Sequence, residues 1–242
     1  MFTLLTLPCD GPEASGAGLD AAMDGALLSG AGAVVFDLGG AAAPGDRSAW
    51  RDAAAGALRR RGVAPQRGRP LAVVAVAPLA AGVLDADLAA VMAGAPDAVL
   101  LPGAVGSRDL QHLAAKLAVR EAEHGLEAGR TRILAVPADT AAGVLALPTL
   151  PGATPRMLAL CWDAEALAAD LGVGTDASPV RSARDLLLIA AAAAGVPAFD
   201  RGGPGDDLAA ACRAARRDGF AGRIARSPQE VPAIAAAFAP RR

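Results

Sequence analysis

Aromatic residues are scarce in this sequence, and its charges nearly balance. Phe and Trp together make up 3% of the 242 residues and tyrosine is absent, so few rings are present on which nucleic-acid bases could stack. The formal net charge of -2 at pH 7 gives no general positive field for a polyanion. Nucleic acid is therefore not an expected partner.

Long hydrophobic runs and a disulfide framework are also lacking. Hydrophobic residues make up 53% of the chain, yet no uncharged run approaches the roughly 20 residues of a membrane-spanning helix. The opening segment, MFTLLTLPCDG, has neither the positive start nor the long apolar core of a signal peptide, and is expected to form a first strand. The three scattered cysteines, Cys9, Cys161 and Cys212, have no metal-type spacing. We expect a cytoplasmic protein with no membrane contact.

Short apolar runs alternate with alanine-rich helical segments, which is the pattern of repeated βαβ units. The predicted strands are residues 2–7, 33–38, 71–77, 98–101, 133–136, 157–161, 197–199 and 222–225. The predicted helices include residues 46–61, 107–123, 164–171, 182–194 and 207–217, with Ser107 as an N-cap and Gly195 as a left-handed end residue. This pattern favours one α/β domain over residues 1–242, a (β/α)8 TIM barrel, over an open doubly wound sheet.

Functional residues of such a barrel follow the carboxyl ends of its strands. The residues found there are Cys9, Asp10, Asp37, Gly103, Asp139, Thr140, Trp162, Asp163, Asp200, Arg201, Arg226 and Ser227. For most of them a loop polar group or a helix cap is the more common role. The loop RGGPGDD, residues 201–207, has the glycines of a phosphate nest, but Asp206 and Asp207 would repel an anion.

Several consecutive segments resemble the HpcH/HpaI aldolase and citrate lyase β-subunit family. GAGAVVFDLGGAAAPGDRSAWR is similar to GADAVVLDLEDAVAP with its K..AR continuation, and LAVVAVAPLAAGVLDADL to VRVNPL followed by DL. Later, ILAVPADTAAGVLAL is similar to an ETAAGV segment, MLALCWDAEALAADLG to LGAEDLAADLG, and DGFAGRIARSPQEV to GFDGKWAIHPSQV. Essentially the whole chain is covered in order.

The resemblance implies a TIM barrel of the phosphoenolpyruvate/pyruvate-like type. It further implies a Mg-dependent carbon–carbon lyase acting on a CoA thioester of the citryl-, malyl- or citramalyl-CoA type, while some members hydrolyse the thioester instead. A homo-oligomer, commonly a trimer, is implied as well. Many members continue into a C-terminal lid, whereas this sequence ends at Arg242 shortly after FAP, and we expect a barrel without that lid.

Carried over residue by residue, most of the family's functional positions are lost. The two acids of DLED fall on Gly39 and Gly40, which leaves Asp37. The other replaced positions are Phe2 for an arginine, Ala75 and Ala77 for the arginine and asparagine of VRVN, Gly103 for a lysine, Ala166 for a metal-holding aspartate, and Ser227 for the histidine of IHP. Arg47 and Arg223 merely replace lysines, in a sequence whose only lysine is Lys116.

The loss of these functional side chains should greatly lower the rate of the family's lyase reaction. One missing oxyanion-stabilising donor typically lowers a rate by about 100- to 1000-fold. Three independent losses would remove roughly a million-fold, which rivals the lower end of enzymatic accelerations, although losses within one site are not additive. We expect that the family's lyase mechanism does not run here.

A displaced magnesium site is a second expectation. Mg²⁺ is held by one or two carboxylates plus water and substrate oxygens, so Asp139, which replaces a metal-holding glutamate, would suffice with Asp163 or Glu165. The alternative is that Asp163 caps the following helix and Glu165 faces solvent. Cys161 and Trp162 are expected to pack the top of the barrel.

Two functional hypotheses follow. In the first, the chain is a non-catalytic barrel, a pseudoenzyme that serves as a binding or structural partner, as a homo-oligomer or with an intact paralogue. In the second, it is a CoA-thioester lyase or hydrolase that acts on an acyl-CoA or a small 2-oxo or hydroxy acid. Its catalytic acids would then be Asp37 and Asp139, with Asp163 completing the site. The lost positions favour the first hypothesis.

Overall fold

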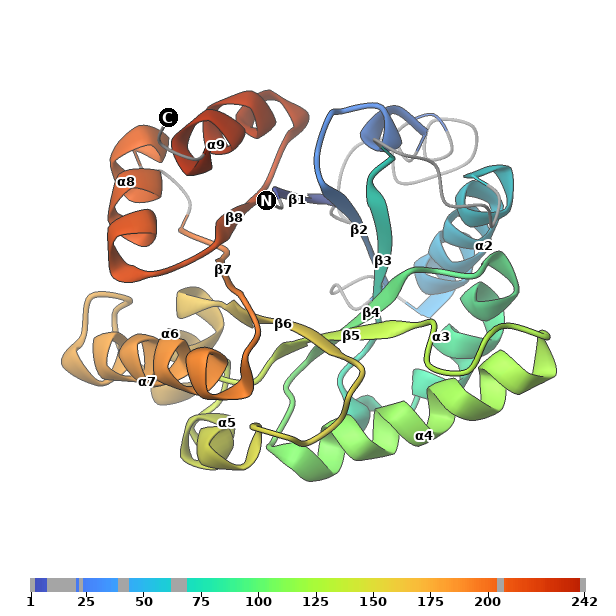
Figure 1. Ribbon diagram of the computed structural model, residues 1–242, viewed down its shortest axis with the longest axis horizontal. Coiled ribbons are helices and arrows are strands. Elements are labelled where there is room, and N and C mark those ends of the chain that lie inside the picture. Colours follow the sequence, from blue (N-terminus) through green and yellow to red (C-terminus); the bar gives the residue numbers. More distant parts are fainter. Residues whose placement is uncertain are drawn as a thin grey trace.

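A computed structural model describes residues 3–7, 21, 24–38, 44–61, 69–203 and 207–239 of the chain. Its strands form a closed barrel in sequence order, in which each strand pairs in parallel with the next and β8 returns to β1 (Figure 1). The strands are β1 (Leu4–Leu7), β2 (Ala33–Asp37), β3 (Leu71–Ala75), β4 (Ala98–Pro102), β5 (Arg132–Val136), β6 (Met157–Trp162), β7 (Ala198–Asp200) and β8 (Gly222–Ala225). The predicted TIM barrel is confirmed.

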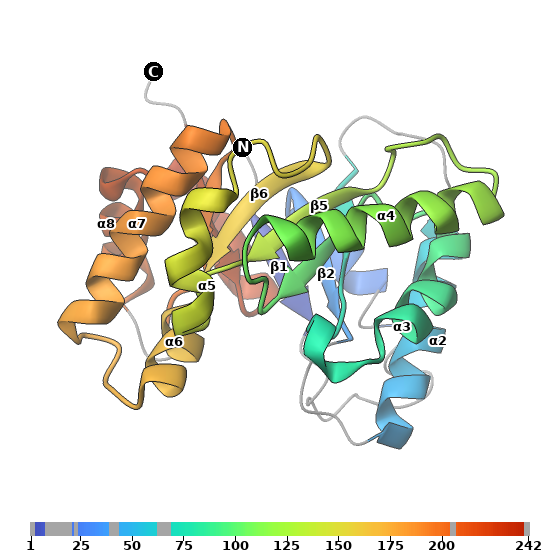
Figure 2. The ribbon, with the colours of Figure 1, turned by 90° about the horizontal axis from the view of Figure 1, so that it is seen from below.

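Helices surround this barrel. They are α2 (Pro44–Arg61), α3 (Leu84–Val91), α4 (Ser107–Glu123), α5 (Ala141–Ala146), α6 (Ala164–Leu171), α7 (Ser178–Ala194), α8 (Leu208–Asp218) and α9 (Val231–Phe238), with short 3-10 turns at Leu79–Ala81, Met92–Gly94, Leu147–Thr149 and Pro228–Glu230. Figures 1 and 2 show α5, α6 and α7 together on one side, with α2, α3 and α4 on the other. Among the described helices none is long and apolar enough to cross a membrane.

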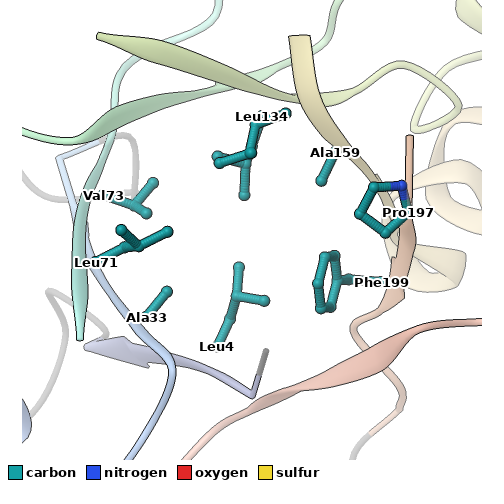
Figure 3. Close-up of a pocket in the computed structure, with 9 residues that line it drawn as sticks. Leu4, Ala33, Leu71, Val73, Leu134, Ala159, Pro197 and Phe199 are labelled. Atoms are coloured by element: carbon teal, nitrogen blue, oxygen red, sulfur yellow. The ribbon is translucent and has the colours of Figure 1, made fainter. Parts of the chain in front are cut away.

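The core has two layers, because strands of a parallel barrel are buried on both faces. On β2, Val34 and Phe36 face the helices, whereas Ala33 and Val35 face the barrel interior. At the amino end, the interior encloses an apolar cavity of about 30 Å³ (Figure 3). Its lining residues are Leu4, Ala33, Leu71, Val73, Leu134, Leu158, Ala159, Pro197 and Phe199. None of these described lining residues has a polar side chain.

Some element boundaries differ from prediction for local reasons. Helix α7 begins at Ser178 rather than at residue 182, since Pro179 fits the first helical turn, where no backbone N–H is required. Strand β3 ends at Ala75 rather than at residue 77, and the Ala77 N–H donates to Asp87 Oδ2 instead (2.9 Å).

Two predicted helix-end residues have opposite outcomes. The predicted cap at Ser107 is wrong, because Ser107 is the first helical residue and Gly106, at φ 77°, takes the N-cap position of α4 without a side-chain bond. Gly195 ends α7 in the left-handed conformation at φ 68°, as predicted.

Candidate functional site

A cavity of about 260 Å³ opens at the carboxyl end of the barrel, where parallel α/β barrels carry their active sites. It is lined by residues that follow or end the strands: Thr6, Val35, Asp37, Ala75, Leu100, Pro102, Val136, Asp139, Cys161, Trp162, Asp163, Ala166, Arg201 and Ile224. Most of this wall is apolar. Three acids and one arginine supply the charged groups among the described lining residues.

Asp139 follows β5 and is partly buried. Its Oδ2 accepts a hydrogen bond from Gly103 N (2.7 Å), while Oδ1 is buried and has no hydrogen-bond partner among the described residues. Burial, together with the negative charges of Asp163 and Asp170, raises the pKa of Asp139 from 3.8 to about 6. The hydrogen bond from Gly103 N opposes this rise, because it stabilises the carboxylate. Near pH 6 this carboxyl therefore retains a proton much of the time.

Asp163 follows β6 and has both oxygens engaged. Its Oδ1 accepts from Ala166 N (3.1 Å) and so caps α6, as the ordinary alternative predicted. Its Oδ2 accepts from Arg201 Nη1 at 2.5 Å. The partner arginine reaches it from the end of β7, the strand beside β6.

Glu165 lies outside the barrel-end cavity. It lines a separate groove of about 450 Å³ with residues of α7, α8 and the end of β7, and its Oε2 accepts from Arg226 Nη2 (3.1 Å). The described residues contain no group of three His, Cys, Asp or Glu side chains that could hold a metal ion. Asp139, Asp163 and Glu165 therefore do not meet as a set, and their role as metal ligands stays a prediction.

Cys161 and Trp162 are buried in the upper barrel, 1% and 2% exposed, where they were expected to pack. Burial raises the pKa of the Cys161 thiol to about 12, so a thiolate nucleophile is strongly disfavoured. Two other candidates after strand ends have structural partners: Thr140 Oγ1 caps α5 by accepting from Gly143 N (3.1 Å), and buried Asp200 pairs with Arg223 (3.5 Å). Ser227 precedes a 3-10 turn at Pro228–Glu230, and its side chain does not cap that turn.

The phosphate-nest loop is described only in part. At its end, Asp207 Oδ1 accepts from Ala209 N (3.0 Å) and Ala210 N (3.2 Å), which occupies the start of α8. The remaining candidates Cys9 and Asp10, the replaced positions Phe2, Gly39 and Gly40, and Asp206 lie outside the described residues.

A buried cluster that was not singled out from the sequence supports the end of β3. Asp87, which is fully buried, accepts from Arg51 Nε (2.8 Å) as well as from Ala77 N, and Arg47 Nη1 lies 3.5 Å from its Oδ2. The cluster's residues lie in two segments already compared with the family: Arg47 and Arg51 in the one similar to K..AR, and Asp87 in the one similar to DL. These segments are far apart in sequence, and the fold brings them together. These residues hold a strand end in place and do not line the cavity.

Comparison with known proteins agrees with the barrel. The family model described as HpcH/HpaI aldolase/citrate lyase matches residues 17–221. RipC from Yersinia pestis has a similar fold, with a TM-score of 0.76 at 21% identity over 100% of this chain and 96% of that chain. No curated protein sequence matches.

Two structures from Mycobacterium tuberculosis are also similar. The citrate lyase beta subunit has a TM-score of 0.73 at 25% identity, covering 99% of this chain and 97% of that chain. Protein CitE in complex with magnesium, acetoacetate and coenzyme A has a TM-score of 0.71 at 25% identity, covering 100% and 82%.

Proposed function

Because the chain belongs to the HpcH/HpaI aldolase/citrate lyase family, we propose that it is a non-catalytic member, a barrel that acts as a binding or structural partner without the family's lyase reaction. The observation that carries this proposal is the composition of the barrel-end cavity. Its walls are mostly apolar, and Arg201 is the only basic side chain among its described lining residues. An oxyanion that develops during carbon–carbon cleavage needs positive charge aimed at it.

The replaced positions support the same proposal. Ala75, which replaces the strand-three arginine, lines the cavity with a methyl group. Gly103, which replaces a lysine, contributes its backbone N–H to Asp139 and has no side chain to offer. Both changes remove cations from the place where the resemblance expects them.

The described donors do not fit a bound magnesium ion. Both oxygens of Asp163 are engaged, and Ala166, which replaces the family's aspartate, lines the cavity without a ligand atom. Asp37 and Asp139 remain on the cavity wall, and the raised pKa of Asp139 means that a proton competes for that carboxylate. The described residues contain no group of three His, Cys, Asp or Glu side chains that could surround the ion. We therefore derive no reaction step through a metal.

A second candidate function is favoured by one observation: Asp37, Asp139 and Asp163 line the same cavity. If they formed a rearranged site, the chain would be a Mg-dependent acyl-CoA lyase or thioester hydrolase. The similar CitE structure contains magnesium, acetoacetate and coenzyme A, which makes such ligands the natural probes.

Partner and compartment belong to the proposal as well. Large hydrophobic side chains are exposed on adjacent helices, with Leu145 of α5 at 84% and Leu186 and Ile189 of α7 at 48% and 65%. Such a surface supports association with further copies or with an intact paralogue. The free cysteines Cys161 and Cys212 support a reducing, cytoplasmic location.

Steady-state turnover on citryl-, malyl- and citramalyl-CoA, with Mg²⁺ and with a chelator, separates the two functions. We expect no cleavage or hydrolysis above the protein-free rate for the wild type. Mg-dependent turnover that Asp139→Ala abolishes and that a surface variant such as Glu123→Gln retains would establish the enzyme instead. Glu123 is suited to this control because it lies on α4, forms an exposed ion pair with Arg120 (2.8 Å) and does not line the cavity.

A further inference from the structure

The barrel interior is incompletely filled at its amino end. The cavity of about 30 Å³ lies there among side chains that the strands point inward (Figure 3). Bulky branched residues usually fill this space in a TIM barrel. Here two of the inward positions are alanines, Ala33 of β2 and Ala159 of β6, which reach the cavity from opposite sides (Figure 3). The short side chains at these two positions leave the space open.

The amino-end cavity is one level of the interior, and the carboxyl-end cavity is the next. On β2, Ala33 lines the first and Val35 the second, and on β3 Val73 and Ala75 are divided in the same way. Residues two apart on a strand point to the same face, so both cavities belong to one inward surface. The described lining residues of the two cavities do not overlap. A substitution can therefore alter one cavity without entering the other.

A bulge in β6 adds to the apolar wall. Ile133 of β5 lies opposite Met157, whereas Leu134 lies opposite Ala159, which leaves Leu158 as an extra residue. Leu158 and Ala159 both line the cavity, although successive strand residues ordinarily point to opposite faces. Leu158 is only partly buried, so the cavity lies just below the surface of the barrel end.

Water is poorly suited to this cavity. A buried water molecule needs roughly two to four polar partners, and the described lining residues offer no polar side chain. The strand backbones are engaged in the hydrogen bonds of the closed barrel. The volume of about 30 Å³ has room for roughly two water-sized spheres, which need about 10–15 Å³ each. An apolar atom or diatomic molecule gains dispersion contacts with these walls and loses no hydrogen bond.

We infer that the amino-end cavity is a binding site for one small, uncharged, apolar molecule of the size of a xenon atom or dioxygen. Charged and hydrogen-bonding molecules are excluded, because their polar groups would be buried without partners. The inference goes beyond the proposed function and does not depend on it, since the two concern opposite ends of the barrel.

The test uses xenon gas as the probe, titrated by pressure onto the full chain with carbon-13-labelled Leu and Val methyl groups. We expect the methyl resonances of Leu4, Val73 and Leu134, which line the cavity, to shift with a saturable dependence on xenon pressure. Ala33→Val and Ala159→Val each place a branched side chain in the space. Each should abolish the saturable shift.

Ala75→Val is the matched control. It makes the same change of side chain on the inward face of β3, but at the level of the carboxyl-end cavity. This variant should keep the saturable xenon shift. The two filling variants act from opposite walls, so a folding defect in one leaves the other, and the dispersion of the methyl spectrum reports folding in each case.

Three results would overturn the inference. They are a shift in the wild type that rises linearly with pressure and does not saturate, a saturable shift that persists in a folded filling variant, and a loss of the shift in Ala75→Val. The turnover assay is read separately, because turnover would refute the proposed function without touching the xenon site, and an absence of xenon binding would leave the proposed function unchanged.

Discussion

Asp163 illustrates what the sequence reveals about a single residue and what it leaves open. Its position directly after a predicted strand and before an alanine-rich helix predicted a cap, and the bond from Ala166 N confirms it. The pairing with Arg201 was not predicted, because the two residues are 38 positions apart and meet only where β6 and β7 lie side by side. Strand ends can be located from one sequence, but the side chains that meet across them cannot.

Glu121 of α4 is a buried carboxylate whose two oxygens accept four hydrogen bonds. It is 1% exposed, and it accepts from both terminal nitrogens of Arg156 (2.7 Å each) and from Thr131 N (2.7 Å) and Gly129 N (2.9 Å). Burial alone would raise its pKa, but these bonds outweigh burial and lower the pKa from 4.5 to about 2. Its charge therefore stabilises the fold above its unfolded pKa, and that contribution is lost as the pH falls from about 4.5 toward 2.

Glu121→Gln should lower the free energy of unfolding near neutral pH by about 3 to 5 kcal/mol, because it leaves the Arg156 guanidinium buried without its carboxylate. On acidification, the stability of the variant should also fall less than that of the wild type. Urea unfolding near pH 7 and at several acidic pH values measures both effects.

The control for this prediction lies on the same helix. Glu123→Gln removes a carboxylate that is 47% exposed and pairs with Arg120 at i,i+3, so it should change stability by less than about 1 kcal/mol. Equal effects of the two substitutions would show that burial of the Glu121 pair is not what stabilises the protein.

At the scale of elements, the backbone is tightly packed at the junction between β5 and α5, beside the cavity. A Cβ added to Gly143 would lie 1.9 Å from the carbonyl oxygen of Pro137, so α5 can begin where it does only with glycine there. The same turn carries Asp139 and the Thr140 cap. The short helix α5 was not among the helices predicted, because six residues give too little periodicity to detect.

Gly143→Ala should destabilise the protein by about 1 to 3 kcal/mol or more, because the backbone of α5 must shift away from Pro137. Gly25→Ala is the matched substitution. Gly25 lies in the helical residues 24–27 with nothing within 4 Å of an added Cβ, so alanine should stabilise the protein by about 0.5 to 1 kcal/mol. Thermal and urea unfolding of both variants check the opposite signs, and a neutral effect of Gly143→Ala would contradict the contact.

Other elements were predicted closely, for physical reasons. Helices α4 and α6 match their predicted bounds, because each presents a periodic apolar face to the barrel. Strand β8 also matches, since Gly222–Ala225 is a short run between turn residues. The end of β3 and the N-cap of α4 instead involve contacts with Asp87 and Thr149, which sequence periodicity does not reveal.

At the scale of the whole molecule, the two ends of the barrel differ in kind. The amino end is closed by apolar side chains around a small cavity (Figure 3), whereas the carboxyl end holds Asp37, Asp139, Asp163 and Arg201. The alternation of segments favoured a barrel over an open sheet, and the similarity of the segments to the family's motifs predicted the family. The site is harder to predict, because its properties depend on which charges remain together after the replacements at Ala75, Gly103 and Ala166.

The central claim is that this barrel keeps the family's fold without its metal-dependent lyase chemistry. The most direct measurement is single-turnover cleavage, with the full chain in excess over malyl-CoA at saturating Mg²⁺ and the CoA species followed by chromatography and mass spectrometry. Excess protein makes even one slow turnover visible. We predict that malyl-CoA is lost no faster with the protein than without it. The Mg²⁺-dependent appearance of acetyl-CoA or free CoA would contradict the account.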